Sequence, residues 1–141
     1  MIITGHDIDI LARTIYGEAR GEPLEGQIAV AWVVRNRATL ADHRRQFGIG
    51  TLASACQAPW QFSCWNENDP NRQKLFAVDL NDPIFRRCYF AALGVVDVDY
   101  GFAYDPTHGA LFYYADTIDP PSWAVGKPYI QIGHHRFIKD A

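Results

Sequence analysis

Residues 23–40, PLEGQIAVAWVVRNRATL, place the strongest constraint on the fold of this chain. The helix that this segment predicts is apolar on most sides, through Ile28, Ala29, Ala31, Trp32, Val33 and Val34. Such a helix is normally buried at the centre of a domain, because no face of it prefers water. Pro23 suits its first turn, where a missing N–H costs little. We therefore expect the other elements to pack around this helix.

Two further long helices are predicted from the spacing of apolar residues. The first covers about residues 5–20, where Thr4 or Asp7 can cap the start and Gly21 favours a stop. The second begins at Pro83, a residue that is common at the first helical position. Both are long enough to contribute to a shared core with the central helix.

The remainder of the chain predicts loops and a small sheet. Residues 42–72 are loop-like, with a short helix at about 51–56. Two strands are expected, at 110–115 and 129–138, and they can pair as an antiparallel hairpin around a turn-rich linker. Helices followed by a small antiparallel sheet form an α+β pattern. We expect one domain over residues 1–141.

Charge and hydropathy argue against several kinds of partner. The net charge is −3 and Lys and Arg do not cluster, so nucleic acid is not an expected partner. No stretch approaches the ~20 apolar residues that span a bilayer, so we expect no membrane insertion. The N-terminal MIITGHDIDI has no basic start or long apolar run, which predicts no signal peptide. The expectation is a monomer that is made in the cytoplasm.

Cysteine and histidine positions predict neither a cofactor nor a metal. Cys56, Cys64 and Cys88 are odd in number and form no C-x-x-C pair, so we interpret them as free, partly buried thiols. His134 and His135 are neighbours on a predicted strand and point apart, which makes a poor metal-binding pair. The sequence also contains no Gly-rich phosphate loop.

Glu18 is unusual for its position in the YGEARGE motif. On a helical wheel it lies beside Leu11 and Ile15, at the edge of the apolar face. A carboxyl group against apolar surface has a raised pKa, as a general acid needs near neutral pH. The negative end of the helix dipole disfavours a carboxylate there as well. The alternative is that Glu18 reaches solvent or pairs with Arg35 or Arg37.

The other acids have weaker claims to a chemical role. Glu22 follows Gly21, so its orientation is undefined, and Glu25 lies in a first helical turn, where an acid is favourable. For both we expect an ordinary structural or surface role. Asp105, Asp116 and Asp119 flank the first predicted strand and can face a groove, but each is also a good turn residue.

The sequence resembles the SleB-like cell wall hydrolases, the catalytic domains of spore cortex-lytic enzymes and their bacterial and phage relatives. The resemblance runs from about Ile10 to Phe137 through YGEARGEPLEGQIAVAWVVRNR, FSCW, DPTHGALFYYA and IGHHRF, in family order. It implies a small lysozyme-like α+β domain that cleaves peptidoglycan glycan strands. A signal peptide and a separate wall-binding domain, which many relatives have, are not seen. This favours a phage lysin, a virion component or a standalone bacterial enzyme over a spore role.

The resemblance also implies roles for individual residues. Glu18 would be the catalytic acid, and Tyr113, Tyr114 and His135 would lie near the groove. His134 stands where the family often has Asn, so the motif histidine is assigned to His135. Substrate-binding residues are also expected in the QFSCW loop, at Gln61, Phe62, Ser63 and Trp65.

The aromatic residues have two interpretations that the sequence leaves open. Trp60, Phe62, Trp65 and Tyr114 can stack on sugar faces, or they can fill the core. Tyr113 and Tyr114 face opposite sides of their predicted strand, so one of them is expected in the core. Gln61, Ser63 and Asn66 are candidate donors to acetamido or hydroxyl groups.

One clear acid favours lytic transglycosylation after N-acetylmuramic acid, in which Glu18 serves as acid and then as base and a 1,6-anhydro sugar forms. The first alternative is a two-carboxylate muramidase or glucosaminidase, with its second acid among Asp105, Asp116 and Asp119. The second is a zinc-dependent N-acetylmuramoyl-L-alanine amidase. The third is a non-catalytic glycan-binding or virion module.

Overall fold

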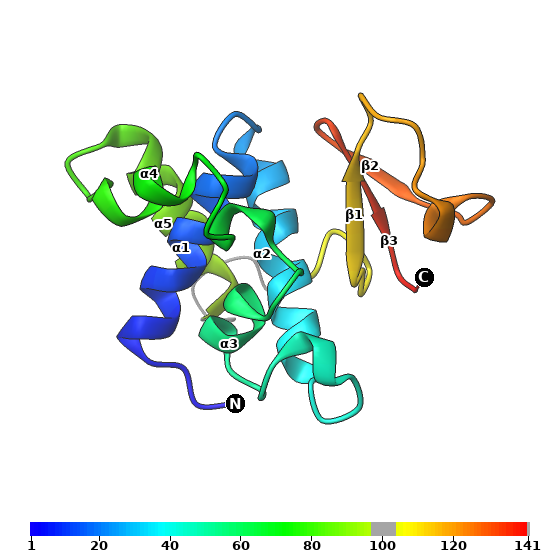
Figure 1. The fold of residues 1–141 in the computed structure, drawn as a ribbon, viewed down its shortest axis with the longest axis horizontal. Coiled ribbons are helices and arrows are strands. Elements are labelled where there is room, and N and C mark those ends of the chain that lie inside the picture. The colour runs from blue at the N-terminus through cyan, green and yellow to red at the C-terminus, as the bar shows by residue number, and fades with distance from the viewer. Residues whose placement is uncertain (97–103, 141) are drawn as a thin grey trace.

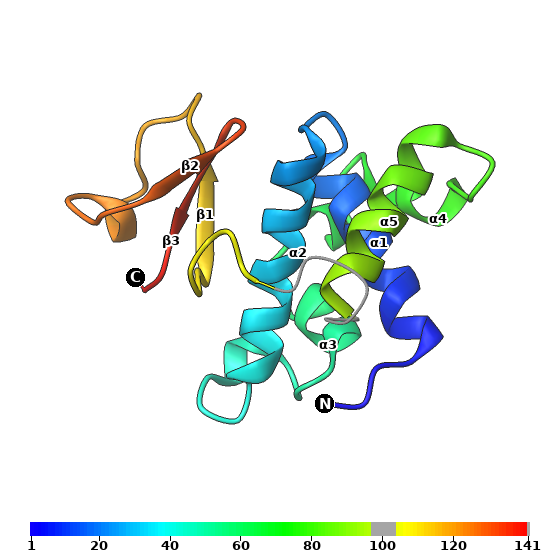
Figure 2. The same ribbon diagram turned by 180° about the vertical axis from the view of Figure 1, so that it is seen from behind.

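The computed structural model describes residues 1–96 and 104–140. The helix α2 lies between the other helices and the sheet, as Figures 1 and 2 show from opposite sides. The α-helices of the described residues are α1 (Gly5–Ala19), α2 (Leu24–Thr39), α3 (Leu52–Gln57), α4 (Arg72–Ala77) and α5 (Pro83–Val96). The strands are β1 (Phe112–Ala115), β2 (Ile130–Ile132) and β3 (His135–Ile138), and short 3-10 helices are η1 (Arg45–Phe47), η2 (Ser63–Trp65) and η3 (Ser122–Ala124).

The buried central helix that was predicted over residues 23–40 is confirmed as α2. Its buried residues are distributed around the helix: Gly26, Gln27, Ile28, Ala29, Val30, Ala31, Trp32, Val33, Val34, Arg37 and Ala38. Pro23 is the N-cap of this helix and not a residue of its first turn. In the described part of the chain, no helix is both long enough and apolar enough to cross a membrane.

Two polar residues fix the start of α1 and join it to α3. Thr4 is the N-cap: its hydroxyl accepts the N–H of Asp7, and the Asp7 carboxylate accepts the N–H of Thr4. This capping box satisfies donors that a helix start otherwise leaves unpaired. The second oxygen of Asp7 accepts the backbone N–H of Ala53 at 2.9 Å, which ties α3 to the base of α1.

The sheet has three strands instead of the predicted two. The segment expected as one strand, 129–138, folds back on itself between β2 and β3, and the order is β1-β3-β2 with antiparallel pairs. Gly133 makes the turn possible because it adopts φ +57°, a conformation that residues with a Cβ rarely adopt. His134 lies in this turn and not on a strand. The prediction of a simple two-stranded hairpin was therefore wrong.

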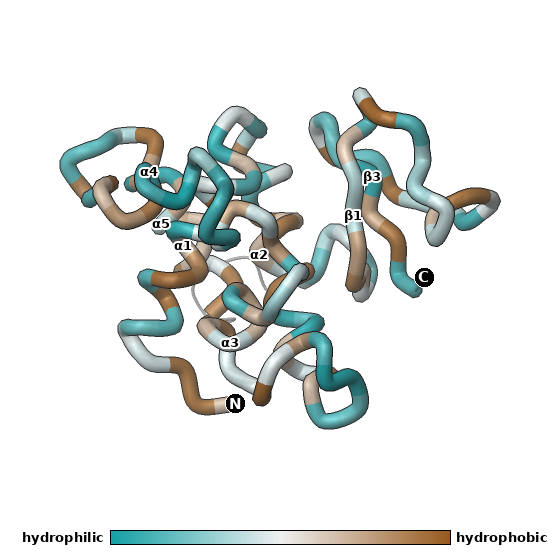
Figure 3. The backbone as a smooth tube through the Cα atoms, viewed as in Figure 1, coloured by the Kyte–Doolittle hydropathy of each residue, from teal (hydrophilic) through white to brown (hydrophobic). Residues whose placement is uncertain are grey.

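The two faces of the sheet have different surroundings. Tyr113 pairs with Phe137 across β1 and β3, and both pack with the large hydrophobic core that the helices form. Tyr114 faces the opposite side, where it packs with Ala124 and Ile138 in a separate small cluster. Figure 3 shows hydrophobic residues along much of β1 and β3, whereas the loop beside α4 is largely hydrophilic.

The region predicted as mostly loop, 42–72, is more ordered than expected. The predicted short helix is present as α3, and the QFSCW segment contains η2. The helix α4, which begins at Arg72, was not predicted. All three cysteines are free, as expected, and all are buried.

Candidate active site

The Glu18 side chain lies in the last turn of α1, partly buried, on the side where the QFSCW segment packs. Burial raises the pKa of this carboxyl group from 4.5 to about 7; the negative charge of Asp69 adds to the shift, and Arg37 opposes it. Within residues 1–96 and 104–140, Glu18 forms no ion pair with Arg35 or Arg37. Instead, Arg35 donates to the carbonyl of Val95. The site therefore holds a carboxyl group that is largely protonated just below neutral pH.

Tyr113 is the residue of β1 on which the charge of Glu18 acts. It faces the helices, and burial together with the charge of Glu18 raises the pKa of its phenol well above the ordinary value. The phenol therefore stays protonated near neutral pH and can donate a hydrogen bond there. Its ring contacts His135, with ring centroids 4.9 Å apart, and Phe137, with centroids 5.5 Å apart.

Arg37 is the basic residue whose positive charge acts on the Glu18 carboxyl group. Its place in the site was not predicted. It is buried, and its Nε donates to the carbonyl of Leu111 at 2.7 Å. Its guanidinium lies 4.7 Å from the ring centroid of Phe62. One terminal nitrogen reaches the Gln61 side-chain oxygen at 3.4 Å. In the sequence, Arg37 stands out only as a basic residue near the end of a largely apolar helix.

The QFSCW segment packs directly on α1 beside Glu18. A Cβ atom at Gly17 would lie 2.7 Å from the Cβ of Cys64, so only glycine allows this approach. The Trp65 indole N–H donates to the hydroxyl of Thr14 at 2.9 Å, and Thr14 is fully buried in α1. The segment is thus attached to the helix that carries Glu18 at Gly17 and at Thr14, three residues earlier.

A pocket of about 610 Å³ opens along this segment, lined by Gln57, Ala58, Pro59, Trp60, Phe62, Trp65, Asn66, Glu67 and Asn68. Trp60 is 87 % exposed and adopts φ +68°, which is unusual for a residue with a large side chain. Phe62, by contrast, is buried in the core. The lining combines aromatic surface with side-chain amides, a composition that suits sugar rings and acetamido groups.

The structure brings together some of the predicted site residues and separates others. Gln61 and Phe62 contact Arg37, and Tyr113 and Glu18 both act electrostatically on Arg37. Trp65 and the exposed Ser63 lie in η2 of the QFSCW segment, and His135 packs against the ring of Tyr113. Tyr114 is buried on the far side of the sheet.

The sequence offered Asp105, Asp116 and Asp119 as a second carboxylate, but the acid whose charge acts on Glu18 is Asp69. The Asp105 carboxylate accepts the N–H groups of Thr107 and Gly109 and the amide of Asn36, so it holds a turn. Asp119 is exposed. Asp69 was not considered from the sequence, because its partner Glu18 lies 51 positions earlier in the chain. The local pattern DPNR around Asp69 predicts only a turn.

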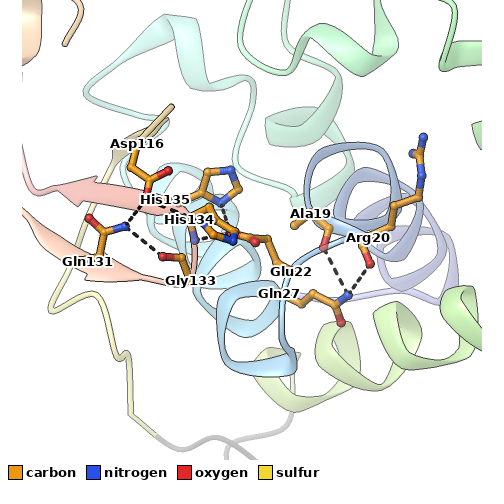
Figure 4. A network of polar contacts seen from close by, with 9 residues as sticks. All are labelled: Ala19, Arg20, Glu22, Gln27, Asp116, Gln131, Gly133, His134 and His135. Atoms are coloured by element: carbon orange, nitrogen blue, oxygen red, sulfur yellow. Dashed lines mark hydrogen bonds and ion pairs between the residues drawn. The ribbon is translucent and has the colours of Figure 1, made fainter. Parts of the chain in front are cut away.

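Asp116 and Glu22 belong to a polar network at the turn between β2 and β3 (Figure 4). Glu22 is buried, with 7 % exposure, so its orientation, which the sequence left undefined, is toward the interior. Its Oε1 accepts the backbone N–H of His134 at 2.8 Å and lies 3.4 Å from Nδ1 of His135. Asp116 lies 3.7 Å from Nδ1 of His134, whose side chain is mostly exposed.

A family model described as Cell Wall Hydrolase matches residues 21–138, and the chain belongs to this family. The matched range begins three residues after Glu18, so it does not itself include the acid.

Curated relatives align over a longer range that does include Glu18. The chain is 33 % identical over 135 residues to a spore cortex-lytic enzyme of Oceanobacillus iheyensis, covering 95 % of this chain and 42 % of that protein. It is 33 % identical over 136 residues to a spore cortex-lytic enzyme of Bacillus subtilis strain 168, covering 95 % and 38 %. The chain therefore spans about two-fifths of the length of these relatives.

Two solved structures share the fold. One is the catalytic domain of the germination-specific lytic transglycosylase SleB from Bacillus anthracis, with TM-score 0.69, 28 % identity and 96 % coverage of both chains. The other is the catalytic domain of Bacillus cereus SleB, with TM-score 0.69, 29 % identity, and coverage of 98 % of this chain and 93 % of that chain. These matches confirm the predicted fold class, a lysozyme-like α+β domain with a short antiparallel sheet.

Proposed function

We propose that this chain cleaves the glycan strands of peptidoglycan by lytic transglycosylation after N-acetylmuramic acid. The observation that carries the proposal is the Glu18 carboxyl group, partly buried and with its pKa raised to about 7. Such a group is protonated often enough near neutral pH to act as an acid, and its conjugate base is strong enough to take a proton back. The solved catalytic domain of SleB from Bacillus anthracis, a germination-specific lytic transglycosylase, supports the same reaction.

In the first step Glu18 donates its proton to the glycosidic oxygen, and the bond from that oxygen to C1 of N-acetylmuramic acid breaks. In the second step the Glu18 carboxylate accepts the proton of the C6 hydroxyl as that oxygen bonds to C1. A 1,6-anhydro ring forms, no water is consumed, and Glu18 returns to its protonated state. We propose that Tyr113 and Arg37, which both interact electrostatically with Glu18, donate hydrogen bonds or compensate charge while Glu18 is ionised.

The pocket along the QFSCW segment is the proposed glycan-binding surface. Its exposed Trp60 and partly exposed Trp65 offer flat faces for sugar rings, and Asn66 and Asn68 offer amides for acetamido groups. We propose that the protein acts on the cell wall as a monomer. We also propose that it reaches the wall as a lysin, as a virion component or by another export route.

A two-carboxylate hydrolase is the second candidate, because Asp69 acts electrostatically on Glu18. In that reaction Asp69 would serve as nucleophile or would activate a water molecule. The product would then be a reducing sugar with no anhydro ring. The amidase alternative would release stem peptides and leave the glycan strand intact.

Digestion of purified peptidoglycan with wild type, Glu18→Gln and Glu25→Gln tests the proposal. Glu25→Gln is a matched control, because Glu25 is exposed at the start of α2. Mass spectrometry is expected to find anhydro-muropeptides with wild type and with Glu25→Gln, and none with Glu18→Gln. Reducing ends would favour the two-carboxylate hydrolase, released peptides would favour the amidase, and no fragments from wild type would favour a binding module.

A further inference from the structure

Glu22 lies in a loop, but its carboxylate makes contacts that a solvent-exposed acid would not make. It lies between α1 and α2, and its carboxylate reaches across to the turn between β2 and β3 (Figure 4). There it accepts the backbone N–H of His134 at 2.8 Å. It also lies 3.4 Å from Nδ1 of His135, a buried atom with no hydrogen bond of ordinary geometry among the described residues.

Two glycines leave the space that this carboxylate occupies. A Cβ atom at Gly133 would lie 2.9 Å from Oε1 of Glu22, and one at Gly26 would lie 3.2 Å from the Glu22 Cβ. Gly133 additionally adopts φ +57°, which a larger residue would strain. The turn of the sheet and the first turn of α2 are thus both shaped around the Glu22 side chain.

The loop between α1 and α2, which contains Glu22, is attached to the end of α1, the helix that carries Glu18. Gln27 is fully buried in α2, and its amide donates to the carbonyl of Ala19 at 3.2 Å, one residue after Glu18. The backbone N–H of Glu22 donates to the same carbonyl at 3.0 Å. Glu22 is therefore fixed relative to the end of α1 before its side chain reaches the sheet.

His135 continues the path from Glu22 to the site. Its ring contacts the ring of Tyr113, with centroids 4.9 Å apart, and Tyr113 faces the helices, where the charge of Glu18 acts on its phenol. The sheet has few other attachments to α1, since it lies on the far side of α2 (Figure 1). The contact at the turn of β2 and β3 is therefore one of the attachments that hold β1, together with the hydrogen bond from Arg37 to Leu111.

We propose that Glu22 is a positioning residue: it holds the turn of β2 and β3 against the end of α1, so that His135 keeps Tyr113 beside Glu18. This inference rests on the proposed function of Glu18 for its effect on catalysis. Its structural part, the dependence of the Tyr113 position on Glu22, is independent of that function.

Two substitutions disturb this contact from opposite sides. Glu22→Ala removes the acceptor of the His134 N–H, whereas Gly133→Ala forces the turn away from an intact Glu22. Gly126→Ala is the matched control, because Gly126 also has a positive φ, +76°, but a Cβ there would meet nothing within 4 Å. Glu22→Gln is the conservative variant, since its side-chain oxygen can still accept the His134 N–H.

Kinetics on peptidoglycan fragments and NMR of the Tyr113 and His135 rings are measured for each variant. For Glu22→Ala and Gly133→Ala we expect kcat to fall about 10-fold or more with KM within about twofold, and both ring signals to shift. Glu22→Gln is expected to restore most of kcat, and Gly126→Ala to resemble wild type. Where Glu22→Ala does not fold, the same measurements on Gly133→Ala decide.

Unchanged Tyr113 signals in the folded variants would overturn the positioning role, as would a kcat within about twofold of wild type. Equal loss of kcat in Gly126→Ala would also overturn it, because strain alone would then explain the effect. A wild-type protein that does not cleave peptidoglycan would instead contradict the proposed function. The ring signals would still test Glu22 in that case.

Discussion

Gly17 packs so closely on Cys64 that any side chain at position 17 would displace the QFSCW segment. An added Cβ would lie 2.7 Å from the Cβ of Cys64, 2.8 Å from its sulfur and 2.9 Å from Cδ2 of Leu75. Glu18 is the next residue, so this contact sets the distance between the acid and the segment that is proposed to bind glycan. The glycine in the YGEARGE motif thus has a packing reason as well as a place beside the acid.

We predict that Gly17→Ala destabilises the protein by about 2 kcal/mol, the usual range for overpacking, despite the better helix propensity of alanine. The measurement is chemical denaturation followed by circular dichroism. Gly21→Ala is the control, because a Cβ at Gly21 would meet nothing within 4 Å. Equal stability of the two variants would contradict the packing explanation.

The pH dependence of activity is predicted from the ionisation of Glu18. The acid step needs the protonated carboxyl group, whose pKa burial raises to about 7. The value of kcat/KM should therefore fall on the alkaline side with an apparent pKa near 7. Rates measured at constant ionic strength from about pH 5 to about pH 9 check this. A midpoint near the ordinary carboxyl value would be incompatible with Glu18 as the acid.

Glu18 is also predicted to cost stability at alkaline pH. Because its pKa is raised from 4.5 to about 7 on folding, the folded state keeps a proton that the unfolded state releases between these values. Stability therefore falls as pH rises through this window, by roughly 3 kcal/mol in total. Glu18→Gln should be more stable than wild type at about pH 8 and no more stable near pH 4 in denaturant titrations. The same gain at both pH values would show another cause.

Asp69→Asn separates the two proposed reactions. Asn keeps an oxygen that can accept the Asn71 N–H, as Asp69 does at 2.8 Å, but it removes the negative charge near Glu18. For a transglycosylase we expect activity to persist and the alkaline midpoint to move to lower pH. Loss of nearly all activity, with the fold intact by circular dichroism, would assign the second carboxylate to Asp69 and favour hydrolysis.

Periodicity was sufficient to predict α2 as the centre of the fold and to place Glu18 against apolar surface, because both depend on residues within one helix. The turn at Gly133 was missed because IGHHRF reads equally well as one extended strand. Its conformation depends on Glu22, which lies 111 positions earlier. Asp69 was missed and Arg37 was considered only as an ion-pair partner of Glu18, since their effects on Glu18 depend on how separate segments pack.

Digestion in water enriched in heavy oxygen tests the central claim most directly. If Glu18 serves as both acid and base and the C6 hydroxyl attacks C1, the products should carry no heavy oxygen at the new muramic acid end. Mass spectrometry of the muropeptides should find that end as an anhydro ring. A heavy oxygen atom on C1 of the muramic acid end would show that water is the nucleophile, and would contradict transglycosylation.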